Sequence, residues 1–209
     1  LELLVSGGHT ELVLMKKFGS YKIIGETLDD AAGEAFDKVA RMLELGYPGG
    51  PAISACAEKN FQFPISNFPI KLPRPMITSK DYNFSFSGLK TAVLYLLRDI
   101  NNKRRIRLLR PAIAHEFQDA VVDVLVAKTN AAAKEYRVKT IALGGGVSAN
   151  KLLRERLAHD IKKNMPAVRL FLPHPLLTGD NALMIALAAF IDGKKKAPKS
   201  VGADANMRL

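Results

Sequence analysis

The sequence predicts an α/β fold in which helices pack on a mixed sheet. Three strand-like segments follow one another near the N-terminus, and helical and strand-like segments alternate in the second half of the chain. A length of 209 residues suits one large domain or two small ones. An apolar content of 48% is typical of a globular protein.

The N-terminal strands form a predicted hairpin around a glycine-rich turn. Residues 3–5 end one strand, residues 6–9 make the turn, and residues 10–15 return as the second strand. Residues 21–27 then predict a third strand. Neighbouring N–H groups in such a turn can bind an anion, and the alternative is an ordinary hairpin with an exposed His9.

Two helices are expected after the third strand. Residues 29–43 predict an amphipathic helix whose positive N-terminal end suits Asp29 and Asp30. The glycines and prolines of residues 46–51 interrupt this pattern, and Pro51 is expected to open the second helix.

The middle of the chain changes character twice. Residues 61–83 are rich in proline, phenylalanine and lysine and predict a long irregular segment. Helices are expected over residues 84–99 and 113–136. The first of them opens with the hydroxyls of Ser85 and Ser87, which suit a helix cap or a phosphate-binding turn but lack the spacing of a P-loop.

The most informative motif is the glycine triplet of residues 144–146. It joins a predicted buried strand, residues 139–143, to a helix over residues 150–163. Glycines let the backbone approach a ligand here, and the N–H groups that open the helix favour a phosphate. A merely tight connection is the alternative. A strand over residues 168–172 and an apolar helix over residues 180–191 complete the pattern.

The chain carries a formal net charge of +11, which is typical of a protein that binds a polyanion. The densest basic cluster is residues 103–107 with Arg110, and a second is residues 194–196 with Lys199. A solvated basic surface is the alternative. The single cysteine, Cys56, excludes an intrachain disulfide and suits a buried position in a reducing compartment. No apolar stretch is long enough to span a bilayer, and residues 182–191 suit a buried helix instead.

Three acidic side chains, Asp30, Glu34 and Asp37, share one face of the first helix because they lie four and three residues apart. That face could hold a ribose or a metal. For Glu34 a surface salt bridge is the favoured interpretation, since Lys38 lies four residues later on the same face of the helix. Arg41 follows Asp37 in the same way, and the pattern alone leaves the role of Asp37 open.

Asp180 stands before the last predicted helix, where it can act either as an N-cap or as a carboxylate ligand of a metal. Metal sites in proteins usually need three or more ligands. The four histidines show no pairing that would complete such a site, so this chain alone supports a metal only weakly.

Six ordered motifs resemble the TsaD family of tRNA N6-adenosine threonylcarbamoyltransferases. The resemblance runs nearly from end to end of the chain, and the motifs that carry it are residues 4–10, 27–38, 46–51, 84–91, 145–150 and 180–182. The resemblance implies the two-domain, actin-like and sugar-kinase-like ATPase fold, here mainly its second domain with a mixed sheet and flanking helices. Residues 1–193 would be its C-terminal part, with the N-terminal domain largely missing, and residues 194–209 a basic, flexible tail.

The resemblance also implies a reaction and its site. The family transfers the threonylcarbamoyl group from threonylcarbamoyl-AMP to N6 of the adenosine beside the tRNA anticodon. Asp37, Gly50 and Asn150 would contact this adenylate, and Asp180 would bind a metal. The residues that would line the adenylate are Leu4, Val5, Ser6, Gly7 and Gly8. No catalytic residue is identified, and His9 is the candidate for a polar contact.

Cofactor and partners follow from the same resemblance. One divalent metal ion per subunit is implied, iron(II) or alternatively zinc, whose other ligands are two histidines on an upstream helix that this sequence lacks. This chain alone is therefore not expected to complete the reaction. The expected partners are tRNA, threonylcarbamoyl-AMP and the proteins of a threonylcarbamoyl-transfer complex, with no membrane, in the cytoplasm or, alternatively, in an organelle.

Two departures from the family pattern and three rival functions bear on this assignment. Residues 178–179 are Thr-Gly where Cys-Thr is common, and Glu44 stands where glycine is usual. A non-catalytic scaffold, like the family's dimerisation partner, is opposed by the presence of Asp37, Asn150 and Asp180. A metalloprotease would need a His-Glu-x-x-His helix, which the chain lacks. A sugar-kinase-like phosphotransferase would need a base and a sugar pocket that no motif supplies.

Overall fold

The computed structural model describes residues 1–17, 19–59 and 70–193. Its sheet has five strands in the order β3-β2-β1-β4-β5. They are β1 Glu2–Val5, β2 Thr10–Lys17, β3 Ser20–Glu26, β4 Thr140–Gly144 and β5 Arg169–Phe171. β2 pairs antiparallel with β1 and β3, while β4 lies parallel to β1 and β5. The predicted mixed sheet and its N-terminal hairpin are confirmed.

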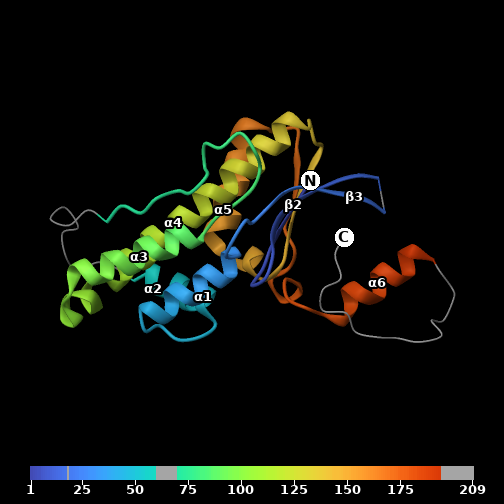
Figure 1. Cartoon of the computed structure of the whole chain (residues 1–209). Coiled ribbons are helices and arrows are strands. Elements are labelled where there is room, and N and C mark those ends of the chain that lie inside the picture. The colour runs from blue at the N-terminus through green and yellow to red at the C-terminus, as the bar shows by residue number, and fades with distance from the viewer. Residues whose placement is uncertain (18, 60–69, 194–209) are drawn as a thin grey trace.

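Six α-helices flank this sheet in the described part of the chain. They are α1 Ala32–Met42, α2 Gly49–Ala57, α3 Ser87–Ile100, α4 Lys103–Glu135, α5 Lys151–Asn164 and α6 Ala182–Asp192, with short 3-10 turns η2 Gly146–Ala149 and η3 Pro175–Leu177. Figure 1 shows α1 to α5 on one side of the sheet and α6 on the other. The core therefore lies between the sheet and α1 to α5.

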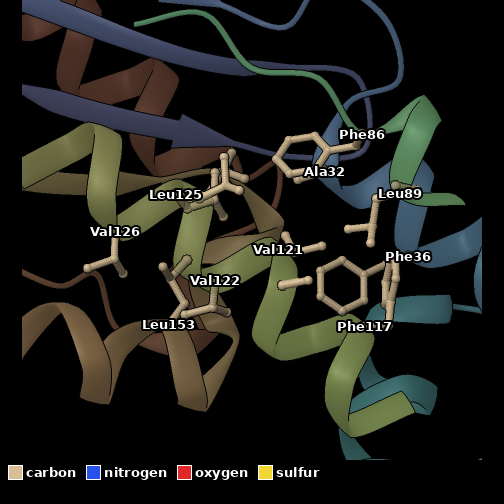
Figure 2. Close-up of a cluster of buried hydrophobic side chains, with 14 of the residues drawn as sticks. Ala32, Phe36, Phe86, Leu89, Phe117, Val121, Val122, Leu125, Val126 and Leu153 are labelled. Carbon is tan, nitrogen blue, oxygen red and sulfur yellow. The ribbon is translucent and has the colours of Figure 1, made fainter. Parts of the chain in front are cut away.

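The core follows from the alternation of side chains along the strands. Leu3 and Val5 of β1 are fully buried under the helices, whereas Glu2 and Leu4, which alternate with them, are only half-buried. The ring of Phe36 on α1 meets that of Phe117 on α4 edge to face, with ring centres 5.2 Å apart (Figure 2). This packing fixes α1, which carries the predicted site residue Asp37, against α4.

α1 begins at Ala32 rather than at Asp29, so the predicted start of this helix is wrong. The hydroxyl of Thr10 on β2 accepts a hydrogen bond from the Ala32 N–H at 2.9 Å, and thus caps the helix from 22 residues away. Asp30 pairs with Lys38 at 2.8 Å. The sequence around α1 does not reveal this cap, because the hydroxyl comes from a distant strand. Asp29 and Asp30 are therefore predicted in the first turn of the helix, where acidic residues are common.

Asp29 instead caps α3. Its carboxylate accepts hydrogen bonds from the N–H groups of Phe86 and Ser87 at 2.8 and 3.1 Å. It also accepts from the hydroxyls of Ser85 and Ser87 at 2.6 and 2.7 Å. The turn whose sequence suits a phosphate is therefore occupied by an internal carboxylate. Desolvation raises the pKa of Asp29, but the four hydrogen bonds outweigh it and bring the pKa below its ordinary value.

α4 begins at Lys103, well before the predicted residue 113, and contains Pro111. The side chain of Asn102 caps it by accepting from the Arg105 N–H at 2.9 Å. A proline inside a helix removes one backbone hydrogen bond. In α4 the tertiary packing of the helical turns before and after Pro111 outweighs the free energy lost with that bond. The predicted start of this helix at residue 113 is therefore wrong.

The segment before α3 is irregular, as predicted, and α4 holds it in place. Residues 70–83 form no helix or strand, and residues 61–69 lie outside the described part of the chain. Arg74 forms ion pairs with two carboxylates of α4. The buried Lys128 of α4 donates to the Asp81 carbonyl at 2.9 Å, and burial lowers the pKa of its ammonium group.

α6 is exposed, although its apolar sequence suits a buried helix. The exposed fraction is 64% at Ile185 and 83% at Phe190. The predicted burial of this helix is wrong, because no described element packs over its apolar side chains. None of the helices in the described residues combines the length and the apolarity that crossing a bilayer requires. By contrast, the predicted burial of Cys56 is confirmed, and burial raises the pKa of its thiol.

We expect Asp29→Asn to loosen α3 and to lower the free energy of unfolding by about 1 kcal/mol, a value reduced by the solvent exposure of Asp29. The folded-state pKa lies below the ordinary value of 3.8. The carboxylate therefore contributes its full stability above that pH and loses it as the pH falls through the folded-state pKa. Urea unfolding at neutral and acidic pH measures this contribution.

Asp99→Asn is the matched control for this measurement. Asp99 is an exposed carboxylate on the last turn of α3 and has no partner among the described residues. If both variants unfold at the same urea concentration at neutral pH, Asp29 does not anchor α3.

Candidate functional site

The turn of residues 6–9 uses much of its own hydrogen-bonding capacity. The Ser6 hydroxyl accepts hydrogen bonds from the N–H groups of Gly8 and His9 at 3.3 and 3.0 Å. The Ser6 N–H donates to the His9 carbonyl at 2.8 Å and closes the turn. Two N–H groups that an anion could use are therefore engaged, so this turn is a weaker anion site than its sequence suggests.

Two glycines bring this turn against its neighbours. A Cβ on Gly33 of α1 would lie 2.6 Å from the Ser6 carbonyl oxygen, and a Cβ on Gly145 would lie 2.4 Å from the Val5 carbonyl oxygen. Non-bonded atoms do not approach so closely, so only glycine lets α1 and the loop after β4 pack directly on residues 5–7. Gly145 also has a φ of +80°, which favours glycine.

A cavity of about 380 Å³ opens between these turns and the segment that precedes α6. Its lining includes Leu4, Ser6 and His9 from the hairpin. The glycine triplet of residues 144–146 and Asp180 complete the wall on the other side. The structure thus brings both glycine turns and the predicted metal ligand to one cavity.

Three predicted residues of the hairpin lie outside the lining of this cavity. The side chain of Val5 is fully buried in the core, so only its backbone can face a ligand. Gly7 and Gly8 are exposed, and a Cβ on either would meet nothing within 4 Å. The backbone at these two glycines is therefore open to the approach of a ligand.

Asp180 does not have the capping role that its position suggests. Asn181 caps α6 by accepting from the Met184 N–H at 3.0 Å, so the N-cap interpretation of Asp180 is wrong. The second carboxylate of the cavity is Glu2, whose pKa is raised by burial. Within the described residues, no group of three or more His, Cys, Asp or Glu side chains could hold a metal ion.

Asp37 holds the start of α2. Its Oδ1 accepts a hydrogen bond from the Gly49 N–H at 2.7 Å. A Cβ on Gly49 would lie 2.5 Å from the Asp37 Cα, so α2 packs directly on the backbone of α1. α2 therefore begins at Gly49 and not at the predicted Pro51. Asp37 also lies one turn after Gly33, on the face of α1 that meets the hairpin turn.

Gly50 is open where its neighbour Gly49 is closed. A Cβ on Gly50 would meet no protein atom within 4 Å. Next to it, Oδ2 of Asp37 accepts no hydrogen bond from the described residues. An open helical glycine beside a carboxylate oxygen with spare capacity can accommodate a polar ligand.

Asn150 caps α5 and is held by two other helices. Its Oδ1 accepts from the Leu153 N–H at 3.0 Å. Its amide group donates to Ser54 of α2 and Gln118 of α4 at 3.2 and 2.9 Å. Only a lone pair of Oδ1 therefore remains for a ligand. Because Ser54 lies one turn after Gly50 on α2, this network places Asn150 close to the open start of that helix.

Arg154 of α5 ties together two loops that line the cavity. Its guanidinium donates to the Ser148 and Pro173 carbonyls, both at 2.6 Å. Ser148 follows the glycine triplet, and Pro173 begins the segment that leads to Asp180. Among the described residues, this is the only side-chain hydrogen bond between residues 173–193 and the rest of the chain.

Sequence reasoning misses Ser54, Gln118 and Arg154. Gln118 alone leaves a signal, since it interrupts the apolar stripe of α4 and a buried amide needs hydrogen-bond partners. A contact between a side chain and a distant backbone carbonyl leaves no pattern in the sequence.

The acidic face of α1 is divided between ion pairs and the contact with α2. Lys38 pairs with Asp30 and Glu34 at 2.8 and 2.7 Å, which confirms the salt-bridged interpretation of Glu34. Desolvation raises the pKa of Asp30, but hydrogen bonds from Lys38 and Lys90 outweigh it and lower the pKa. Asp37 alone of the three carboxylates is left without a cation partner among the described residues.

Comparisons with known proteins agree on one family. The sequence model of the TsaD family, described as tRNA N6-adenosine threonylcarbamoyltransferase, matches residues 1–187. A protein of that name from Enterococcus faecalis is 48% identical over 198 residues, which are 93% of this chain and 54% of that protein. The Bacillus subtilis protein of the same name is 50% identical over 195 residues, with the same two shares. The chain spans about half the length of the curated relatives it matches.

A solved structure shows the same kind of fold. The crystal structure of T. kodakarensis HypF aligns with a TM-score of 0.53 and 16% sequence identity, over 84% of this chain and 21% of that one. At this identity the likeness shows the fold alone. Together with the family match, it confirms the expected α/β fold of the actin-like ATPase kind.

We expect Arg154→Lys to loosen residues 173–181 and to leave the rest of the fold intact. A lysine offers one ammonium group and cannot span two carbonyls as the planar guanidinium fork does. Backbone N–H groups of this segment should then exchange with deuterium several-fold faster, as measured by mass spectrometry.

Arg156→Lys is the matched control for Arg154→Lys. Arg156 lies two residues further along α5 and pairs with Asp119 and Asp123 of α4, away from the cavity. Equal exchange rates for the segment in both variants would show that Arg154 does not hold it.

Proposed function

This chain belongs to the TsaD family of tRNA N6-adenosine threonylcarbamoyltransferases, and we propose that its cavity holds the acyl-adenylate substrate of such an enzyme. The observation that carries the proposal is the meeting of both glycine turns and Asp180 in one cavity. A site bounded by glycines and backbone N–H groups suits the phosphate of a nucleotide.

The adenylate lies along the backbone of residues 4–8 in this proposal, with its nucleoside towards α1 and α2. A carboxylate can accept hydrogen bonds from ribose hydroxyls, and Asp37 has an oxygen to spare. Gly50 leaves room beside it, and Asn150 contributes the remaining lone pair of its Oδ1. These three residues surround the start of α2 and lie outside the lining of the cavity, and the contact of Gly33 with Ser6 joins α1 to the hairpin turn.

The proposed reaction transfers a threonylcarbamoyl group to tRNA. N6 of the adenosine attacks the carbamoyl carbon, a C–N bond forms, and the C–O bond to the phosphate breaks so that AMP leaves. The amine loses a proton in this step. His9 lines the cavity, and in this proposal its imidazole takes that proton, because histidine is the commonest general base in enzymes. In this proposal, backbone N–H groups of the glycine triplet of residues 144–146 stabilise the negative charge of the departing AMP, because the Gly8 and His9 N–H groups already donate to the Ser6 hydroxyl.

Asp180 is proposed as one ligand of a divalent metal ion, iron(II) or zinc. The described residues alone do not fit such an ion, because no three ligand side chains converge. The remaining ligands would come from groups outside the described residues. Asp180 has the exposure and the freedom from capping that a ligand needs.

A non-catalytic scaffold of the same fold is the alternative function. It would need neither an exposed Asp180 nor an oxygen of Asp37 with spare capacity. The proposal also includes the protein partners of a threonylcarbamoyl-transfer complex and a cytoplasmic location, which the reduced, buried Cys56 suits.

Gly50→Ala tests the nucleoside position, with Gly88→Ala as its matched control. Each glycine is the second residue of a helix, and a Cβ on either meets no protein atom within 4 Å. Both variants should therefore raise the free energy of unfolding by about 0.5–1 kcal/mol. Gly50→Ala alone should weaken binding of a non-hydrolysable threonylcarbamoyl-adenylate analogue, by about tenfold, because the methyl group occupies the space of the ligand.

Isothermal titration calorimetry with the whole chain measures these affinities. Equal affinity in Gly50→Ala and the parent chain would remove α2 from the site. If the parent chain shows no saturable binding, the cavity does not hold the adenylate.

Asp37→Asn separates the two roles of this carboxylate. Asparagine keeps an oxygen that accepts from the Gly49 N–H, but its amide nitrogen cannot accept a hydrogen bond from a ribose hydroxyl. We expect a nearly unchanged thermal unfolding midpoint and about tenfold weaker binding of the same analogue. A lower midpoint with unchanged affinity would make Asp37 a purely structural residue.

A further inference from the structure

The turn between α3 and α4 concentrates the positive charge of the chain. Residues 95–110, here called the basic tip, hold six of the 31 lysines and arginines but only one carboxylate, Asp99. We propose that the basic tip binds the phosphate backbone of the tRNA. The identity of this nucleic acid rests on the proposed function, whereas the place of contact rests on the geometry of the tip.

The basic tip is a helical hairpin that projects from the body of the protein. α3 ends at Ile100, Asn101 turns the chain with a φ of +39°, and Asn102 caps α4. Figure 1 shows this end of the two helices pointing away from the sheet. Side chains from both helices are therefore presented together at an accessible end of the molecule.

The first turn of α4 carries cations where a helix favours anions. Lys103, Arg104 and Arg105 are its first three residues, and no acidic residue accompanies them. The partial positive charge of a helix N-terminus repels cations and attracts phosphates. The arrangement destabilises the helix in the free protein, and a bound polyanion would relieve that repulsion.

Three cations of the basic tip have no carboxylate to neutralise them. Lys103, Arg104 and Arg107 are exposed and form no ion pair with any described residue. Arg110 differs, because it pairs with Glu44 beyond the end of α1. Exposed cations without internal partners are available to phosphates, which receive most protein hydrogen bonds in nucleic-acid complexes.

An exposed aromatic ring lies on the same hairpin. Tyr95 of α3 is 56% exposed, and the Arg98 guanidinium lies 5.9 Å from the centre of its ring. Aromatic rings next to cations are platforms on which unpaired bases stack. The tip therefore offers both kinds of contact that proteins make with single-stranded loops of RNA.

The basic tip suits a nucleic acid better than an anionic membrane. A helix that lies on a bilayer buries an apolar face in it. In the first turns of α4, Ile106 and Leu109 pack on the protein core, which leaves Leu108 as the exposed large apolar side chain. Charge without an apolar face fits phosphate contacts in water.

A triple charge reversal tests the proposal. The tip variant changes Lys103, Arg104 and Arg107 to glutamate. The control variant changes the net charge equally on three exposed lysines of β2 and β3, which are Lys16, Lys17 and Lys22. Fluorescence anisotropy with labelled tRNA measures the Kd of the whole chain from about 50 to about 200 mM salt. Circular dichroism checks that both variants keep the helical content of the parent.

We expect the tip variant to bind tRNA about tenfold more weakly or worse at low salt, and the slope of log Kd against log salt to fall by about 2. The physical reason is that each lost phosphate contact removes about 0.7 to 0.9 from this slope. The control should keep the slope of the parent. If the tip variant and the control variant lose the same amount of tRNA affinity, the loss reflects the net charge of the chain and not the basic tip, and the proposal is wrong.

A milder variant guards against a folding artefact. Arg104→Gln with Arg107→Gln removes two cations without introducing repulsion, and it should lower the slope by about 1.5. If this double variant keeps the slope of log Kd against log salt that the parent chain shows, the proposal is wrong, even if the triple charge reversal binds tRNA weakly.

Two further measurements separate the possible failures. The tip variant should bind the adenylate analogue as the parent does. If tRNA binding depends on the tip while the parent binds no analogue, the basic tip stands and the proposed function falls. If the tip variant loses binding to phosphatidylserine vesicles but keeps its affinity for tRNA, the surface is a membrane contact and the proposal is wrong.

Discussion

The candidate site depends on backbone contacts that leave no room for one extra carbon atom. Gly33, Gly49 and Gly145 let α1, α2 and the loop after β4 touch neighbouring backbone directly. A side chain at any of them would push a wall of the site outward, because the atoms in the way belong to the backbone and cannot rotate aside. The walls around Ser6 and Asp37 therefore stand where they do because side chains are absent from these three positions.

The same criterion divides the motif glycines into two classes that look alike in sequence. Open space surrounds the Cβ positions of one class, which comprises Gly7, Gly8, Gly46, Gly50, Gly88 and Gly146. A Cβ on any of these glycines would make no close contact outside its own local segment, so their backbone is open to a ligand, and Gly46 has in addition a φ of +94° that favours glycine. The closed class holds α1, α2 and the loop after β4 against neighbouring backbone, whereas within the open class Gly146 lines the cavity and Gly50 lies at the start of α2.

The sheet could be predicted because its signals are local, whereas helix starts and the polar network could not. Alternating side chains and a glycine turn define β1 to β3 within a few residues of sequence. The Thr10 hydroxyl that caps α1 comes from a strand, and the helix that follows Asn102 continues through Pro111. The resemblance implies that Asn150 contacts the substrate with its side-chain amide. In the structure its amide nitrogen donates to Ser54, 96 residues away, and its Oδ1 accepts from the Leu153 N–H. Only one acceptor site of the side chain therefore remains for a ligand. Periodicity carries no information about pairs so far apart.

α1 connects the proposed substrate site to the basic tip. Asp37 lies in its middle, and Glu44 lies just beyond its end with a φ of +54°, a conformation that costs a non-glycine residue about 1 kcal/mol. Glycine would adopt it without that cost, but glycine has no carboxylate with which to pair Arg110 of the basic tip. The ion pair offsets part of the strain and joins the tip to α1. Because Phe36 and Phe117 pack α1 on α4, the helix pair that places Asp37 also fixes the orientation of the tip. An RNA bound at the tip, as proposed, would therefore lie at a defined distance from the proposed nucleoside site.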